Sequence, residues 1–108
     1  MKRSVNTLTI AINTTASDSV QLQASLPAML LMPSTFTGTS ILFEVSVDGG
    51  STWRRLYWGG ADYSVPVLAN KAVPVNGAIF LGADSVRLVS NATELGERLV
   101  LLVLEGDN

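Results

Sequence analysis

The chain has 108 residues, neither cysteine nor histidine, and 7 basic against 9 acidic residues, a formal net charge of −2. This length suits one domain that buries its own core. The missing cysteine and histidine exclude disulfides, a Ser-His-Asp triad, a thiol nucleophile and the usual zinc sites. We expect no cofactor, no nucleic-acid partner because the charge is slightly acidic, and no membrane partner because no apolar run approaches the ~20 residues of a spanning helix.

The first third of the chain shows a period of two. Residues 7–12 alternate apolar and polar side chains, and residues 20–24 repeat the pattern, which is typical of half-buried strands. We therefore expect residues 1–26 to form strands or an N-terminal arm. Pro27 and Pro33 bracket the apolar residues 28–32, which we interpret as an edge strand or an ordered connection.

The clearest strand signal follows in residues 39–47, where every second side chain from Ile41 to Val47 is apolar. Further strands are expected in "TWRRLYW", "YSVPVLA" and "AVPV", then in "SVRLVS" and "RLVLLVLE", before a polar tail at residues 105–108. Asn76-Gly77 predicts a two-residue hairpin that joins "AVPV" to "AIFL".

Short strands separated by Gly, Pro, Asn and Ser, with no window of helical spacing, predict an all-β fold. We expect residues 1–108 to form a single antiparallel β-sandwich, jelly-roll-like, with an N-terminal strand or arm.

Residues 99–104 are apolar on both faces, whereas an antiparallel sandwich strand normally buries only one. Either loops of the same chain or another subunit must cover the second face, because each large apolar side chain left in water forgoes roughly 1.5 to 3 kcal/mol of burial. The residues predicted to lie at an interface are Leu30, Leu31, Met32, Leu99, Leu101 and Val103.

The stretch "SVDGGSTW" at residues 46–53 predicts a tight turn. An aspartate accepts backbone hydrogen bonds from the residues that follow it, and glycine supplies positive φ angles. The order resembles the Asp-box, a hairpin motif of sialidase-like propellers and other β proteins in which the aspartate shapes the turn. We expect Trp53 to pin this hairpin to the core. The structural residues of the predicted turn are Asp48, Gly49, Gly50, Thr52 and Trp53.

Two functional interpretations compete with a purely structural one. A calcium site would use Asp48 and Asp62, but no dense carboxylate cluster supplies the six to eight oxygens that calcium needs. Catalysis by paired carboxylates would draw on loop acids, which are normally solvated, so we expect no enzyme activity. The loop acids are Asp48, Asp62, Asp84, Glu94 and Glu97.

The segment "WRRLYWGGADY" offers aromatic rings beside arginines, an arrangement that could stack on sugars. The alternative is that Leu56 and two of the aromatic rings belong to the core while the arginines are solvated or paired with acids. The residues predicted for a ligand or partner surface are Arg54, Arg55, Tyr57, Trp58 and Tyr63.

A second resemblance covers more of the chain. The runs "LLMPSTFTGTSILFEVSVDGGSTWRRLYW", "YSVPVLANKAVPV", "FLGADSVRLVS" and "ERLVLLVL" are similar to small β-sandwich virion proteins of tailed bacteriophages and prophages. The resemblance implies a capsid decoration or cement protein that self-associates and binds the major capsid protein or other virion proteins. It also implies a place on the virion surface after synthesis in the bacterial cytoplasm. The alternative is a carbohydrate-binding module of a head or tail fibre.

Overall fold

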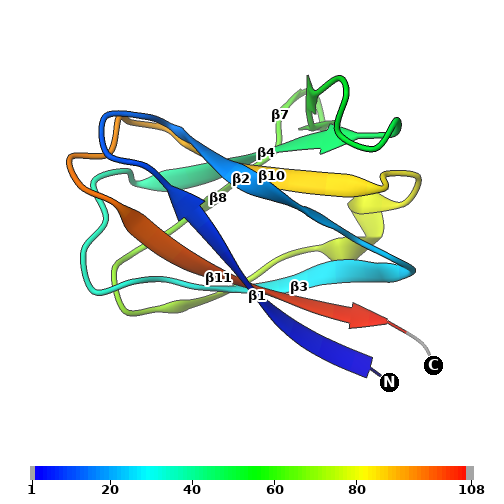
Figure 1. The fold of residues 1–108 in the computed structure, drawn as a ribbon, viewed down its shortest axis with the longest axis horizontal. Coiled ribbons are helices and arrows are strands. Elements are labelled where there is room, and N and C mark those ends of the chain that lie inside the picture. Colours follow the sequence, from blue (N-terminus) through cyan, green and yellow to red (C-terminus); the bar gives the residue numbers. More distant parts are fainter. Residues whose placement is uncertain (1, 107–108) are drawn as a thin grey trace.

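The computed structural model describes residues 2–106, which form two antiparallel sheets packed face to face and a separate two-stranded β6-β7 sheet (Figure 1). One sheet has the strand order β1-β11-β3-β9, and the other has β2-β10-β4 with β5 and β8 paired to β4. The sheets join where Ile10 pairs with Ser17. The elements are β1 (Lys2–Ile10), β2 (Ala16–Gln21), β3 (Ser25–Leu31), β4 (Ser40–Ser46), β5 (Arg54–Arg55), β6 (Tyr57–Trp58), β7 (Ala61–Asp62), β8 (Ser64–Pro66), β9 (Ala72–Pro74), the 3-10 helix η1 (Gly77–Phe80), β10 (Ser85–Ser90) and β11 (Arg98–Gly106).

The strand pairs are nested along the chain. Strand β4 pairs with β8, β3 with β9, β2 with β10, and β1 with β11, all antiparallel. The chain is therefore one long hairpin whose paired arms are rolled over, so that most connections cross from one sheet to the other. This is the topology of a jelly roll, and the predicted all-β antiparallel sandwich is confirmed.

The N-terminal residues are strands of the sandwich and not an arm. Residues 2–10 pair with β11 along their whole length, and residues 16–21 form β2 beside β10. Glu105 and Gly106, placed in the predicted polar tail, belong to β11. Residues 107–108 of that tail lie outside the described residues.

The core lies between the two sheets and is built by alternate residues of each strand. On β11 the inward side chains of Val100, Leu102 and Leu104 are buried. Phe43 from β4 is fully buried and packs edge to face against Phe80 from η1, with 5.2 Å between the ring centroids. No helix among residues 2–106 is long and apolar enough to cross a membrane.

Two local predictions are wrong. Asn76-Gly77 is not a hairpin turn: the Asn76 side chain accepts a hydrogen bond from the Ala78 N–H (3.3 Å) and caps η1. The glycine at position 77 allows a close approach, because a Cβ there would lie 2.5 Å from the Pro27 carbonyl oxygen.

Strand β3 is also not an edge strand, since it lies between β11 and β9. Proline lacks the N–H that an interior strand position normally donates. Pro27 is accommodated because the register of β3 against β11 shifts there, between Val103 and Leu104.

Candidate functional site

The outer face of the β1-β11-β3-β9 sheet, called the outer face below, is apolar. Because Val100, Leu102 and Leu104 point into the core, the intervening residues of β11 point outward. Val103 pairs with Val5 and Met29 on its two sides, and Leu101 pairs with Thr7 and Leu31. The side chains that share this face are Val5, Thr7, Thr9, Met29, Leu31, Ala72, Pro74, Leu99, Leu101 and Val103.

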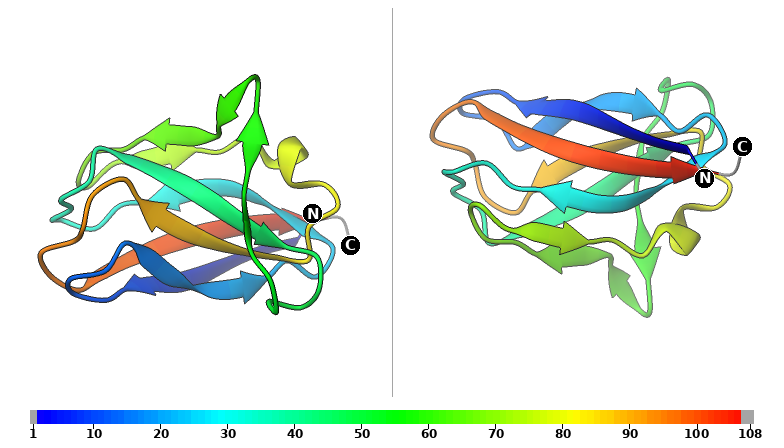
Figure 2. Two further views of the ribbon diagram at one scale, coloured as in Figure 1. Left: turned by 90° about the horizontal axis from the view of Figure 1, so that it is seen from above. Right: turned by 90° about the horizontal axis from the view of Figure 1, so that it is seen from below.

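No loop of the described chain covers this face. The right-hand view of Figure 2 shows the sheet from outside, and no other segment crosses it. Leu99 is 50% exposed and Val5 is 56% exposed. Val103 is buried between its neighbours on the same face, and Leu101 is half-buried. The sequence predicted that either loops of the same chain or another subunit cover this face. No such loop is found among residues 2–106.

The six predicted interface residues are divided between the two faces of their sheet. Leu31, Leu99, Leu101 and Val103 lie on the outer face. Leu30 and Met32 do not: both are buried and belong to the core cluster. An apolar run read without its strand register cannot separate the two faces, because a shift of one residue exchanges them.

The opposite sheet has a polar outer surface. Glu44 on β4 accepts a hydrogen bond from Arg87 on β10 (2.7 Å) and pairs with Arg55 (3.4 Å). The Trp53 ring lies over the Arg87 guanidinium, with 4.7 Å between the guanidinium carbon and the ring centroid. The sandwich therefore has one outer surface with paired charges and one that is apolar.

The turn at residues 46–53 is closed by Asp48. One carboxylate oxygen accepts hydrogen bonds from the Ser46 hydroxyl (2.7 Å) and the Thr52 N–H (3.0 Å), and the other accepts from the Thr52 hydroxyl (2.6 Å). Gly49 and Gly50 have φ angles of +73° and +97°. The hydrogen bonds from Thr52 and then Ser46 lower the pKa of Asp48 to about 2. These hydrogen bonds use both oxygens of the Asp48 carboxylate to hold the turn in shape.

Trp53 does not reach the core as predicted. Its ring is half-buried, lies outside the core cluster and packs on Arg87. The physical reason is that the chain ahead of β5 runs over the outer surface of its sheet, where the ring meets a guanidinium instead of the interior.

The pH dependence of stability tests the role of Asp48. A carboxyl group whose pKa falls from 3.8 to about 2 on folding stabilises the fold above its unfolded pKa. This stabilisation is lost as the pH falls from about 4 towards 2. At neutral pH the melting temperature should be higher for the wild-type protein than for Asp48→Asn, and the difference should shrink across that acid range. A difference that does not vary with pH would contradict the assignment.

The residues predicted for a ligand or partner surface do not all lie on one exposed surface. Tyr57 is 65% and Trp58 is 58% exposed on the small β6-β7 hairpin, which projects from the body of the sandwich (Figure 1). Arg54 is exposed, and Arg55 pairs with Glu44. Tyr63 is half-buried, and its ring packs against Phe43 at the edge of the core, with 5.6 Å between centroids.

Glu94 is the loop acid whose environment differs most from prediction. Its side chain is fully buried, and its carboxylate accepts hydrogen bonds from the N–H groups of Thr37 and Gly38 (both 2.9 Å), the Arg98 guanidinium (2.8 Å) and the Ser90 hydroxyl (2.7 Å). Burial opposes its ionisation, but hydrogen bonds from the Thr37 N–H, Arg98, Ser90 and the Gly38 N–H outweigh that effect and lower the pKa of Glu94. Every oxygen is thus used to join loops at one end of the sandwich.

The acidic side chains of the described residues lie apart from one another. Within residues 2–106 no three acidic side chains gather in a cluster able to hold a metal ion. Asp48 and Glu94 are both engaged in hydrogen bonds that join backbone segments. Comparison with protein-family models, curated proteins and solved structures finds no match for this chain.

Proposed function

We propose that this chain is a non-enzymatic structural protein of a tailed-bacteriophage virion, most simply a capsid decoration protein that binds the shell and associates with copies of itself. The observation that carries the proposal is the uncovered apolar outer face, together with the sequence resemblance to phage virion proteins. An apolar patch of this kind is typical of a protein-protein interaction site.

The area of the outer face is close to what a specific contact needs. Three of its strands have seven to nine residues and β9 has three. With strands about 4.8 Å apart and about 3.4 Å per residue, the face measures about 450 Å² per copy, and two copies bury about 900 Å². This value lies just under the roughly 1,000 Å² that a specific interface should exceed.

The charge on this face also favours self-association. Beyond Val5 and Val103, at the end of the sheet, Arg3 and Glu105 form an ion pair (2.6 Å) whose charges neutralise each other. A second copy that packs on the paired part of this face meets mainly threonine and aliphatic side chains.

Light scattering of two charge variants tests the outer face. The wild-type protein should be an oligomer, and Leu99→Glu should weaken the association at least tenfold, because the new carboxylate would be buried without a partner. Val47→Glu is the matched control, since Val47 is 72% exposed and lies beyond the end of β4 in the other sheet. A monomeric wild-type protein, or equal effects of the two variants, would contradict this use of the face.

A binding experiment separates the two candidate functions. A decoration protein should co-sediment with tailed-phage capsids and leave a glycan array unbound. The second candidate, a carbohydrate-binding module, is favoured by the exposed rings of Tyr57 and Trp58 on the projecting hairpin. That module would bind glycans and lose binding in Trp58→Ala.

A further inference from the structure

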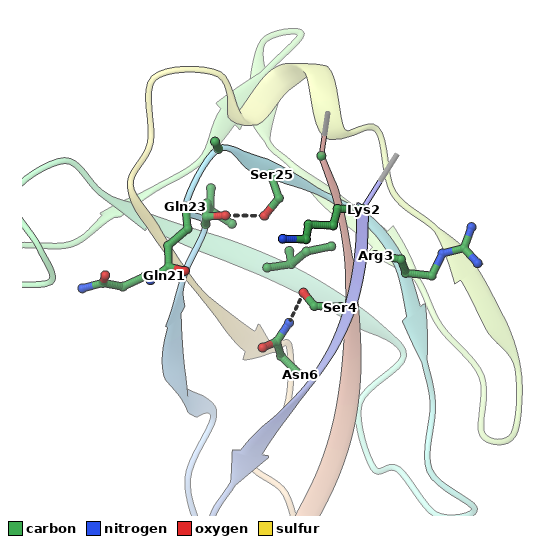
Figure 3. A pocket seen from close by; sticks show the side chains of 11 residues that line it. Lys2, Arg3, Ser4, Asn6, Gln21, Gln23 and Ser25 are labelled. Atoms are coloured by element: carbon green, nitrogen blue, oxygen red, sulfur yellow. Dashed lines mark hydrogen bonds between the residues drawn. The ribbon is translucent and has the colours of Figure 1, made fainter. Parts of the chain in front are cut away.

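Strands β1 and β2 meet at Ile10 and Ser17 and then diverge, which opens a groove between the two sheets (Figure 3). The groove has a volume of about 500 Å³. Leu8 and Ile10 point into the core, and the same face of β1 continues towards the N-terminus with polar side chains. Those polar side chains, Asn6, Ser4 and Lys2, line one wall, and Gln21, Gln23 and Ser25 line the other.

The backbone of β1 presents a free edge to this groove. The Thr9 N–H points away from β11, towards β2, where it donates to the Asp18 carboxylate (2.8 Å). Because the N–H and C=O groups of a strand alternate between its two sides, those of Val5 and Thr7 point the same way. The pairing of β1 with β2 is confined to Ile10 and Ser17, so these groups lie on an edge that is open to another strand.

Within the described part of the chain, the groove also carries a positive charge that forms no ion pair. Arg3 is paired with Glu105, whereas Lys2 forms no ion pair within residues 2–106. Figure 3 shows the Lys2 side chain extending into the space between β1 and the Gln21 side of the groove.

We propose that this groove binds an extended segment of another polypeptide, which adds an antiparallel strand to the free edge of β1 and places an acidic group beside Lys2. Strand addition uses backbone hydrogen bonds for affinity and side-chain contacts for specificity. No aromatic residue lines the groove, so a sugar would find no ring to stack on. The proposal does not depend on the virion assignment, since the groove lies on the inner side of β1 and the outer face lies on its other side.

Synthetic peptides test strand addition directly. The probe is a capped seven-residue peptide of alternating threonine and valine that ends in aspartate, because the C-terminal end of an antiparallel strand lies beside the N-terminal end of β1. In an NMR titration of the full chain, the amide signals of Val5 and Thr7 should shift. The aspartate peptide should bind about tenfold more tightly than the same peptide ending in lysine. N-methylation of the backbone amides that face β1 should weaken binding at least tenfold.

Two variants of the protein complete the experiment. Lys2→Glu should reverse the preference between the aspartate and lysine peptides, and Lys71→Glu, a charge change at an exposed residue outside the groove, should leave it unaltered. Both variants should keep the melting temperature of the wild-type protein. The proposal is overturned if Val5 and Thr7 do not shift, if the N-methylated peptide binds equally well, or if oligosaccharides bind the groove and the peptides do not.

Discussion

Replacement of Glu94 by glutamine should lower the free energy of unfolding by about 3 to 5 kcal/mol, the range for removing one partner of a buried ion pair. The Glu94 carboxylate is fully buried, and its partner Arg98 has only 13% of its side chain exposed. Glutamine has almost the same shape, so the loss reflects charge and hydrogen bonding and not a cavity.

The hydrogen-bond geometry explains why an amide is a poor substitute. Each carboxylate oxygen accepts from one backbone N–H, that of Thr37 or that of Gly38, and from one side chain. An amide NH₂ placed at either end would face a backbone N–H, donor against donor. At least one buried N–H would lose its acceptor, and the Arg98 charge would lose its counter-ion.

Urea unfolding of a matched pair measures this effect. Glu97→Gln makes the same chemical change three residues away at an exposed position and should alter stability by less than about 0.5 kcal/mol. If Glu94→Gln were as mild as Glu97→Gln, the buried carboxylate would not be what holds the loops together.

Truncation of Phe43 to alanine should cost about 3 to 5 kcal/mol, because it removes a fully buried ring and leaves a cavity that the two sheets cannot close. Phe43 contacts both Phe80 and Tyr63, so the change also removes two aromatic contacts. These three rings join β4, η1 and the residue before β8.

Two comparison variants show whether the loss comes from burial. Phe43→Leu keeps most of the apolar volume and should cost less than about 1.5 kcal/mol. Tyr57→Ala removes an aromatic ring that is 65% exposed and should change the free energy of unfolding by about 0.5 kcal/mol or less. Equal losses in Phe43→Ala and Tyr57→Ala, measured by chemical denaturation, would be inconsistent with the core described above.

Local sequence patterns predicted those elements that can be recognised without knowing which strands lie beside them in the fold. Residues 39–47 alternate so regularly that a strand with Ile41 and Phe43 facing the core follows from period two. The same alternation was wrong at its end, because β4 stops at the buried Ser46 and Val47 is exposed. The turn at Asp48 is likewise local, since all the hydrogen bonds of its carboxylate come from residues within four positions. The sequence signals for both features therefore lie within a few positions of one another.

Other positions were misjudged because their environment comes from distant parts of the chain. Glu94 looks like an ordinary loop acid until residues 37 and 38 bring two N–H groups to it. Tyr63 looks like a surface aromatic until Phe43 and Phe80 pack against one side of its ring. The partners of both residues are distant in the sequence, so the residues next to Glu94 and Tyr63 give no sign of them.

The sequence by itself determined that this protein is built of short antiparallel strands, because side-chain alternation and turn residues act over a few positions. It also determined that β11 is apolar on both sides. Only the tertiary structure decided which side faces the core, through the register of β11 against β1 and β3. It likewise decided that no loop of residues 2–106 covers the outer face and that the divergence of β1 from β2 leaves a polar groove, because both features depend on how the rolled hairpin closes.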